Sequence, residues 1–232
     1  MEKLPELSVF FPAYNEEKNI KETVSKATKI LPKIASKYEI IIVDDGSTDK
    51  TGEIADKIAK DNKSVRVVHH HPNRGYGAAL KSGFSKSRYS WVAFTDADGQ
   101  FDFSEIENFL PLTRKADLIL GYRIKRADSI VRRIYTFGWF AIARLLLGLD
   151  VKDYSCGFKL IKKEVFEAVQ PLEGEEKVTQ IELLVKAERL GFKFAEVGVS
   201  HYPRKFGQQT GANLKVVAKS IIDLVKLWQK LR

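Results

Sequence analysis

Short apolar runs alternate with stretches in which apolar residues recur every three or four positions through the first half of the chain. This alternation is typical of βαβ units, in which helices join parallel strands of one sheet. We therefore expect an α/β fold with a mainly parallel central sheet flanked by helices, in a single domain. The apolar runs predict strands at Leu7–Phe11, Tyr38–Val43, Val65–His69, Tyr89–Thr95 and Leu118–Gly121.

The segments between these strands have the periodicity of helices with one buried face. The first such face contains Ile20, Val24, Ala27, Leu31 and Ile34, and the second contains Ile54, Ala55, Ile58 and Ala59. Two patterns typical of capping boxes, Ser104 with Glu107 and Thr179 with Glu182, predict two further helix starts. The second half of the chain is less regular, with expected strands at Gly157–Ile161 and Phe192–Ser200 and a helix at Thr179–Leu190.

Composition limits the class of protein. The 232 residues, 44% hydrophobic and 30% charged, are typical of a globular domain, and no repeat or linker divides them. Cys156 is the single cysteine, and neither a secretory signal nor an apolar stretch long enough to span a membrane is evident. These features predict a cytoplasmic protein, either free or peripheral on the cytoplasmic face of the membrane. The net charge of +9 favours a polyanionic partner or serves solubility.

Three polar clusters follow expected strands: Pro12–Glu17, Asp44–Asp49 and Asp96–Gln100. The carboxyl ends of parallel strands meet at one edge of the sheet, where ligands usually bind. Asp96 and Asp98 would repel each other unless a cation or proton lies between them. A hard divalent cation bound by Asp96, Asp98 and the amide oxygen of Gln100 fits this pattern. A solvated turn beside Gly99 is the alternative.

Seven motifs occur in the order found in the family 2 glycosyltransferases: FFPAYNEEKNI, IIVDDGSTDKT, NRGYGAALKSGF, FTDADGQFD, GYR, CGFKLIKKEVF and HYPRKFGQQTGAN. Together they resemble the branch of dolichyl-phosphate mannose synthases and related polyprenyl-phosphate sugar transferases. The resemblance implies a GT-A fold over 1–232. It further implies a nucleotide-sugar half (1–121), an acceptor half (122–213) and a C-terminal basic amphipathic helix (214–232).

The resemblance also implies roles for individual residues. Asp98 would be the main ligand of Mg²⁺ or Mn²⁺, with Asp96 and Gln100 beside it. The nucleotide would be bound by Pro12, Tyr14, Glu16, Asp44 or Asp45, Asp96 and Ala97. Arg123 and Arg204 would contact the donor diphosphate or the acceptor phosphate, and Arg132, Arg133 and Lys205 the acceptor. The implied catalytic set is Asp98, Arg123, Arg133 and Arg204. Solvated arginines and a capped strand-to-helix turn at Asp44–Asp49 are the alternative interpretations.

The implied reaction is an inverting, metal-dependent transfer of a hexose, mannose or glucose, to a polyprenyl or dolichyl phosphate, with GDP-mannose favoured as the donor. A phosphomonoester has a second pKa of about 6, so the acceptor is already a nucleophile at neutral pH and no strong general base is needed. The alternative is a UDP-sugar donor with a saccharide or other hydroxyl acceptor, which would require a base. No nucleic-acid recognition motif is evident, which disfavours a nucleic-acid-binding module. A catalytically silent membrane scaffold would leave the Asp96, Asp98 and Gln100 cluster unexplained.

Two other features have more than one interpretation. The last helix has an apolar face and lysines largely elsewhere, so it fits an anionic membrane surface, the domain itself or a second subunit. The run His69–His71 is a poor metal site, because consecutive strand residues point to opposite faces. The oligomeric state does not follow from the sequence.

Overall fold

The computed structural model describes residues 3–124, 138, 141–207 and 214–231, with only the backbone of 214–221. The first half alternates strands and helices as β1 (Leu4–Ala13), α1 (Ile20–Ile34), β2 (Ala35–Asp44), α2 (Thr51–Asp61), β3 (Val65–His69), α3 (Tyr76–Lys86) and β4 (Trp91–Phe94). Then follow the 3₁₀ helices η1 (Phe103–Asn108) and η2 (Leu110–Arg114) and the elements β5 (Leu118–Arg123), β6 (Lys159–Lys162), α5 (Lys163–Ala168), α6 (Val178–Arg189), β7 (Phe194–Val199) and α7 (Leu214–Lys230).

The strands of the described segments form one sheet in the order β3-β2-β1-β4-β6-β5-β7. The pairs β1–β2, β1–β4, β2–β3 and β5–β7 are parallel, whereas β6 runs antiparallel to both β4 and β5. The expected α/β fold with a mainly parallel sheet is therefore confirmed. All seven predicted strands occur, with ends shifted by up to three residues.

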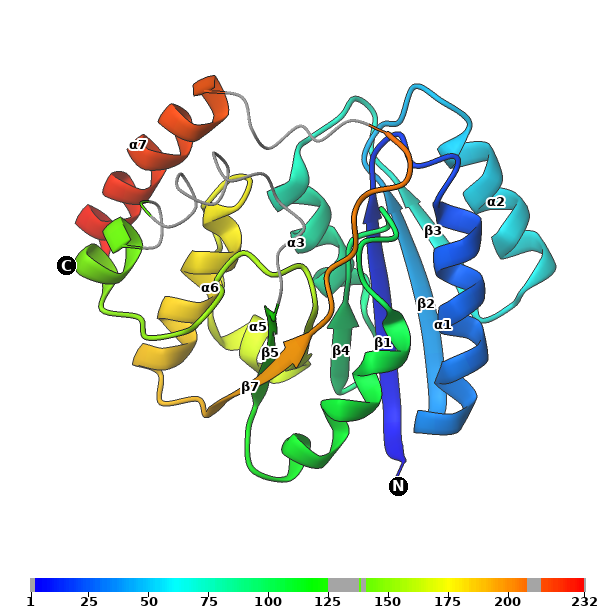
Figure 1. The fold of residues 1–232 in the computed structure, drawn as a ribbon, viewed down its shortest axis with the longest axis horizontal. Helices are drawn as coiled ribbons and strands as arrows, with labels where there is room; N and C mark the ends of the chain where they lie inside the picture. Colours follow the sequence, from blue (N-terminus) through cyan, green and yellow to red (C-terminus); the bar gives the residue numbers. More distant parts are fainter. Residues whose placement is uncertain (1–2, 125–137, 139–140, 208–213, 232) are drawn as a thin grey trace.

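Helices cover both faces of this sheet, so two hydrophobic cores lie on opposite sides of it (Figure 1). Ile40 and Ile42 of β2 belong to the core under α1, and Ile41 and Val43 belong to the core under α3 and α6. This follows from the period of two along a strand, which sends successive side chains to opposite faces. A strand covered on both faces is apolar throughout, which explains the continuous run in β2.

The helical periodicity predicted the buried face of α1 correctly, since all five residues of that face are buried. The two predicted capping boxes are wrong. Asp102 caps η1, because its Oδ1 accepts a hydrogen bond from the backbone N of Ser104 at 3.0 Å, and η1 is a 3₁₀ helix. Glu182 of α6 binds the preceding loop, where it accepts hydrogen bonds from the backbone N of Glu173 and of Gly174.

Strand register brings the polar clusters to one edge of the sheet. Ala13 at the end of β1 lies beside Asp44 at the end of β2, and Asp44 lies beside His69 of β3. The end of β4 is adjacent, because Phe10 of β1 pairs with Phe94. The loops after four parallel strands therefore share this edge. None of the helices in the described segments is long and apolar enough to span a membrane.

Candidate functional site

The loops after β1 and β2 are hydrogen-bonded to each other. The backbone N of Asn15 donates to Ser47 Oγ at 3.0 Å, and the backbone N of Thr48 donates to Asn15 Oδ1 at 2.8 Å. Asn15 has φ 56°, a left-handed conformation that asparagine tolerates better than most residues. Within this loop Pro12 is buried, whereas Tyr14 is 42% exposed. The exposed ring of Tyr14 is thus available to a planar ligand at the edge of the sheet.

Asp44 and Asp45, expected to contact the nucleoside, are both buried and already hydrogen-bonded within the protein. Asp44 Oδ1 accepts from the backbone N of Ser47 at 3.1 Å, and its Oδ2 lies 2.9 Å from His69 Nδ1. Asp45 Oδ1 accepts from the backbone N of Arg74 at 3.0 Å and lies 2.6 Å from His70 Nδ1. These carboxylates therefore hold the loops after β2 and β3 in place.

Two histidines of the run His69–His71 lie side by side, because the rings of His69 and His71 are stacked with their centroids 5.9 Å apart. His69 contacts Asp44 and Asp56, whereas His70 is buried between Asp45 and Ser82. Their pairing with the two adjacent carboxylates is a feature that the sequence analysis missed. Register could have revealed it, because Asp44 pairs directly with His69 in the sheet.

His69 should make the stability of the fold depend on pH. Burial acts to lower the pKa of His69, but the hydrogen bonds and charges of Asp44 and Asp56 outweigh it and raise that pKa above 6.5. A histidine whose pKa is raised in the folded state stabilises the fold fully at pH values below its unfolded-state pKa. This contribution is lost as the pH rises through its folded-state pKa. We expect His69→Gln to lower the free energy of unfolding more at about pH 5.5 than at about pH 8.5, as measured by urea denaturation. Equal losses at both pH values would contradict this linkage.

The loop after β4 carries the expected metal ligands. Ala97 is buried, its backbone N donates to Pro12 O at 3.3 Å, and its O accepts from Thr23 Oγ1 at 3.3 Å. These two hydrogen bonds therefore fix the backbone of the loop between Asp96 and Asp98. Tyr76 Oη donates to Asp96 Oδ1 at 2.9 Å, while the backbone N of Gln100 donates to Asp98 Oδ1 at 3.0 Å.

The charges of this loop fit a divalent cation. Burial and then the charge of Asp98 raise the pKa of Asp96 to about 7, so the two carboxylates resist simultaneous ionisation. A bound Mg²⁺ or Mn²⁺ would remove that repulsion, and carboxylate oxygens are the ligands these hard cations prefer. No group of three or more His, Cys, Asp and Glu side chains among the described residues is arranged so that it could hold a metal ion by itself. The remaining ligands would have to come from water and from the phosphates of a bound nucleotide.

Gln100 is buried and joins this loop to the segment after β7. Its side-chain Nε2 donates to Tyr202 O at 2.9 Å, and its backbone O accepts from the backbone N of Tyr202 at 2.9 Å. The two bonds hold the basic segment that contains Arg204 and Lys205 against the loop after β4 that carries Asp96 and Asp98, here called the carboxylate loop. The side chain of Gln100 thus has a structural role in addition to the oxygen that could face a metal.

Arg204 lies within this acidic cluster. Its guanidinium forms an ion pair with Glu16 and lies 3.7 Å from Asp98 Oδ2. Its Nε donates to Phe206 O at 2.7 Å. Burial raises the pKa of Glu16, and the bond from Asn19 and the charge of Arg204 act in the opposite direction. The loops after β1, β4 and β7 therefore bring Glu16, Asp98 and Arg204 together. The polar clusters predicted this edge for Glu16 and Asp98, whereas the family resemblance alone implied a phosphate-binding role for Arg204.

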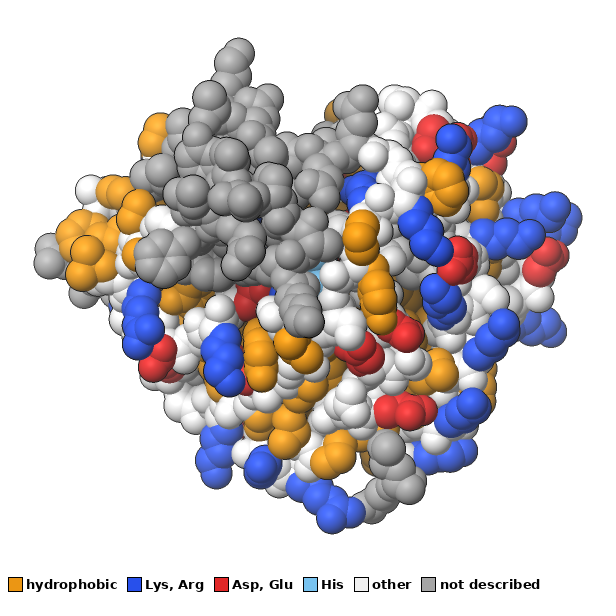
Figure 2. Space-filling view, in the orientation of Figure 1, with side chains coloured by type: hydrophobic (Ala, Val, Ile, Leu, Met, Phe, Trp, Pro, Cys, Tyr) orange, Lys and Arg blue, Asp and Glu red, His pale blue; other side chains and the backbone are white. Residues whose placement is uncertain are grey.

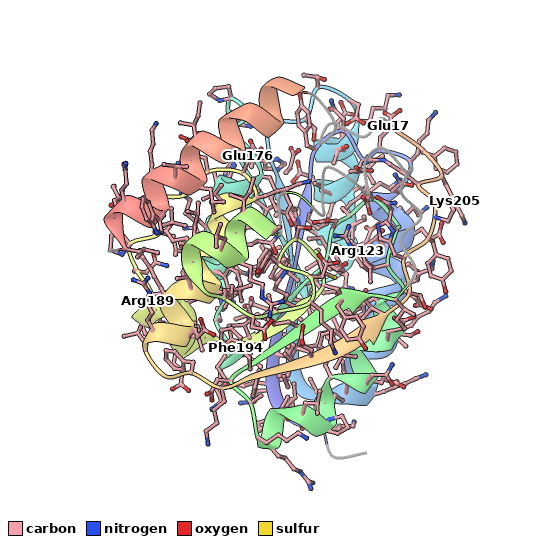
Figure 3. All side chains as sticks on the ribbon, turned by 60° about the vertical axis from the view of Figure 1, so that its left-hand side comes forward. Glu17, Arg123, Glu176, Arg189, Phe194 and Lys205 are labelled. Carbon is pink, nitrogen blue, oxygen red and sulfur yellow. The ribbon has the colours of Figure 1, made fainter. Side chains whose placement is uncertain are left out.

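Arg123, expected to contact the donor diphosphate or the acceptor phosphate, is hydrogen-bonded to a buried carboxylate. Its Nε and one Nη donate to the two oxygens of Asp153 at 2.7 and 2.9 Å, and the same Nη donates to Ser155 Oγ at 2.9 Å. The side chains of Arg123 and Asp153 are only 8% and 3% exposed. In the rotated view Arg123 lies toward the middle of the molecule, whereas Lys205 lies at its right-hand edge (Figure 3). The bidentate pair joins the end of β5 to the loop before β6.

The other expected phosphate ligands differ in position. Lys205 is exposed and lines a groove between α1 and the carboxylate loop, together with Asn19 and Asp98. Arg132 and Arg133 lie outside the described residues. Elsewhere, Lys and Arg side chains are spread over the right-hand side of the molecule, where α1 and α2 lie (Figure 2). The positive charge on this side of the visible face is therefore solvated surface.

Comparison with known proteins shows which family this chain resembles. Residues 8–170 match the family model described as glycosyl transferase family 2. Glycosyltransferase AglD of Haloferax volcanii is 33% identical over 86% of this chain and 33% of its own length. A dolichyl-phosphate beta-glucosyltransferase of Dictyostelium discoideum is 34% identical over 84% of this chain and 65% of its own. This chain therefore spans less than two thirds of these two relatives.

An undecaprenyl-phosphate mannosyltransferase of Micrococcus luteus is 25% identical over 95% of both chains. Among solved structures, glucosyl-3-phosphoglycerate synthase of Mycobacterium tuberculosis with Mn²⁺, UDP and glucosyl-3-phosphoglycerate has a TM-score of 0.73. The match has 21% identity and covers 97% of this chain and 80% of that one, which shows a shared GT-A fold. From the matched family model and the identity to its relatives, this chain belongs to glycosyl transferase family 2.

Proposed function

We propose that the protein transfers a hexose, with inversion, from a nucleotide-sugar to a polyprenyl phosphate. The observation that carries the proposal is the cluster at the carboxyl edge of the sheet, where Asp98, Glu16 and Arg204 come from three loops and lie in contact. Such a cluster of carboxylates and a guanidinium suits a metal-bound diphosphate. The relatives support the lipid acceptor, because their names specify transfer to dolichyl or undecaprenyl phosphate.

Asp98 is proposed as the main ligand of Mg²⁺ or Mn²⁺, with Asp96 beside it and the amide oxygen of Gln100 as a third candidate. The bound metal would stabilise the negative charge that grows on the diphosphate as the sugar bond breaks. On binding of the diphosphate, Arg204 would exchange part of its contact with Glu16 for phosphate oxygens. Its proximity to both carboxylates supports this role.

The nucleoside is proposed to lie against the loops after β1 and β2, beside Pro12, Tyr14 and Glu16. Tyr14 supplies an exposed ring for a base or ribose. Asp44 and Asp45 would act through the oxygen lone pairs that their internal hydrogen bonds leave, since each carboxylate has about four acceptor sites. Ala97 would contact the nucleotide through the backbone of the carboxylate loop.

The acceptor phosphate is proposed to be bound by Arg132, Arg133, Arg204 and Lys205, which all belong to the half of the chain formed by residues 122–213. A phosphomonoester with a second pKa of about 6 attacks without a general base, so the protein has to hold two anions close together. Arg123 would contribute positive potential from beneath the site, because Asp153 occupies its hydrogen-bonding fork. In the C-terminal helix α7, Leu224 and Leu227 are buried in the core under α3 and α6. Peripheral attachment of the enzyme to the cytoplasmic face of the membrane would therefore use the exposed lysines of this helix, Lys226 and Lys230, and not these apolar residues.

The nucleotide base is tested directly by calorimetric titration of GDP and of UDP, each with Mn²⁺ and then with a chelator. GDP-mannose remains the favoured donor from sequence, while the relatives include both glucosyl- and mannosyltransferases by name. Metal-dependent binding of one nucleotide supports the proposal and identifies the base. Binding of neither nucleotide would overturn it.

The acceptor is tested with the donor sugar that matches the bound base, in the presence of polyprenyl phosphate or the corresponding polyprenol. We expect transfer to the phosphate alone, and transfer to the polyprenol or to a saccharide would show a hydroxyl acceptor.

Arg133→Ala should raise the KM for polyprenyl phosphate by about 10-fold or more, as for loss of one charged hydrogen bond, with nucleotide affinity unchanged. Equal loss of donor and acceptor affinity would contradict the assignment of Arg133.

A further inference from the structure

A chain of hydrogen bonds leads from Asp96 into the core between α3, β6 and α6. Tyr76 Oη donates to Asp96 Oδ1 at 2.9 Å, and Gln180 Nε2 donates to Tyr76 Oη at 3.1 Å. Gln180 Oε1 in turn accepts from Lys159 Nζ. Gln180 and Lys159 are buried, with 4% and 1% exposure, and come from α6 and β6. The carboxylate at the edge of the sheet is thus tied to a lysine in the interior.

Lys159 gives this chain a fixed direction. A protonated ammonium group has three donors and no acceptor, and Lys159 Nζ also donates to the carbonyl oxygens of Tyr154 and Cys156. Its contact with Gln180 must therefore use the amide oxygen, which leaves Nε2 to face Tyr76. Tyr76 Oη accepts this bond, so its single proton is directed to Asp96. The interior lysine thereby orients a hydroxyl donor toward the carboxylate.

Two glycines allow Tyr76 to reach this position. Gly75 has φ 85°, and a Cβ on Gly77 would lie 2.3 Å from Thr179 Oγ1 and 2.8 Å from the backbone N of Glu176. The start of α3 can therefore approach the start of α6 closely only without a side chain at 77. On the other side of the carboxylate, a Cβ on Gly157 would lie 2.4 Å from Asp96 Oδ2. Asp96 is thus confined between the hydroxyl of Tyr76 and the backbone of Gly157.

We propose that Tyr76 and Gln180 are positioning residues that act through Asp96, with Lys159 as their anchor. They hold Oδ1 of Asp96 in one orientation, so that the carboxylate is pre-arranged for the metal–nucleotide complex. The inference rests on the proposed function, since it assumes that Asp96 faces that complex. Tyr76 lies in the glycine-containing segment NRGYG. The hydrogen bond from Tyr76 to Asp96 explains why this segment lies beside the site.

The test is the affinity of the Tyr76→Phe variant for the nucleotide that the wild type binds, titrated with Mn²⁺ present. Groups that orient a metal-binding residue typically contribute 10–100-fold to metal affinity, so we expect a loss of about 10-fold or more. Tyr89→Phe is the matched control, because Tyr89 precedes β4 at its opposite end. It should bind as the wild type does. Binding by Tyr76→Phe equal to that of Tyr89→Phe would overturn the proposal.

A double-mutant cycle separates positioning from general loss of packing. If Tyr76 and Gln180 act in one chain, Tyr76→Phe combined with Gln180→Leu should weaken binding no more than the more severe single variant. Additive losses would overturn the joint role.

Gln180→Asn tests the proposal if Tyr76→Phe does not fold, because asparagine keeps the amide but has a shorter side chain. We expect Gln180→Asn to weaken metal-dependent nucleotide binding while its thermal midpoint stays near that of Tyr89→Phe. Unchanged binding by Gln180→Asn would overturn the proposal, whereas absence of nucleotide binding by the wild type would instead refute the proposed function.

Discussion

Asp98→Asn is expected to weaken metal-dependent nucleotide binding by more than about 100-fold, because even residues behind a metal ligand contribute 10–100-fold. The substitution keeps the shape of the side chain and its ability to accept the hydrogen bond from the backbone N of Gln100. It removes the negative charge that a divalent cation requires. Calorimetric titration of the nucleotide with Mn²⁺, compared with the same titration in chelator, measures the loss.

Asp102→Asn is the matched control for Asp98→Asn, because it makes the same chemical change four residues further along the chain. Asp102 caps η1 by accepting from the backbone N of Ser104, and asparagine caps helices about as well as aspartate. We expect Asp102→Asn to bind nucleotide and metal as the wild type does. Unchanged binding by Asp98→Asn would exclude Asp98 as the main metal ligand, and equal losses in both variants would indicate a general effect of charge.

Asp153→Ala is expected to lower the free energy of unfolding by about 3–5 kcal/mol, the usual cost of removing one partner of a buried ion pair. The side chain of Arg123 is 8% exposed and would lose both of its hydrogen bonds to the carboxylate. A buried guanidinium without that anion is poorly solvated, which destabilises the folded state. Urea denaturation of the variant and the wild type measures the difference.

Asp150→Ala provides the comparison for an exposed ion pair on the same loop region. Asp150 lies 2.9 Å from Arg144, and the two side chains are 73% and 66% exposed. Water screens such a pair, so its loss should change the free energy of unfolding by no more than about 1 kcal/mol. A similarly small effect of Asp153→Ala would show that Arg123 is not held in the core by this carboxylate.

The pairing of Arg123 illustrates why the sequence predicted its role incompletely. GYR at the end of an apolar run indicates an arginine at the carboxyl edge of the sheet, and Arg123 does end β5. What the pattern does not contain is Asp153, which lies 30 residues further along the chain. Only folding brings the carboxylate and guanidinium together, so the choice between a phosphate ligand and a buried pair depends on tertiary contacts.

The capping boxes show a similar limit at short range. Ser104 and Glu107 have the spacing of the motif, but Asp102 lies two residues earlier and accepts the bond from Ser104 itself. Glu182 binds backbone groups of the loop at Glu173 and Gly174. Both patterns correctly marked the neighbourhood of a helix start. At η1 the competing carboxylate of Asp102 caps the helix, whereas no side chain among the described residues caps α6.

The sequence by itself determined the alternation of strands and helices, the buried face of α1 and the position of Glu16 and Asp98 at one edge of the sheet. Apolar periodicity and the common direction of parallel strands are local properties, and they are sufficient for these results. Only the tertiary structure decided that Asp44 and Asp45 hold histidines and that Tyr76, Gln180 and Lys159 support Asp96. These contacts join residues 20 or more positions apart, where hydrogen-bond partners are selected by packing and not by spacing along the chain.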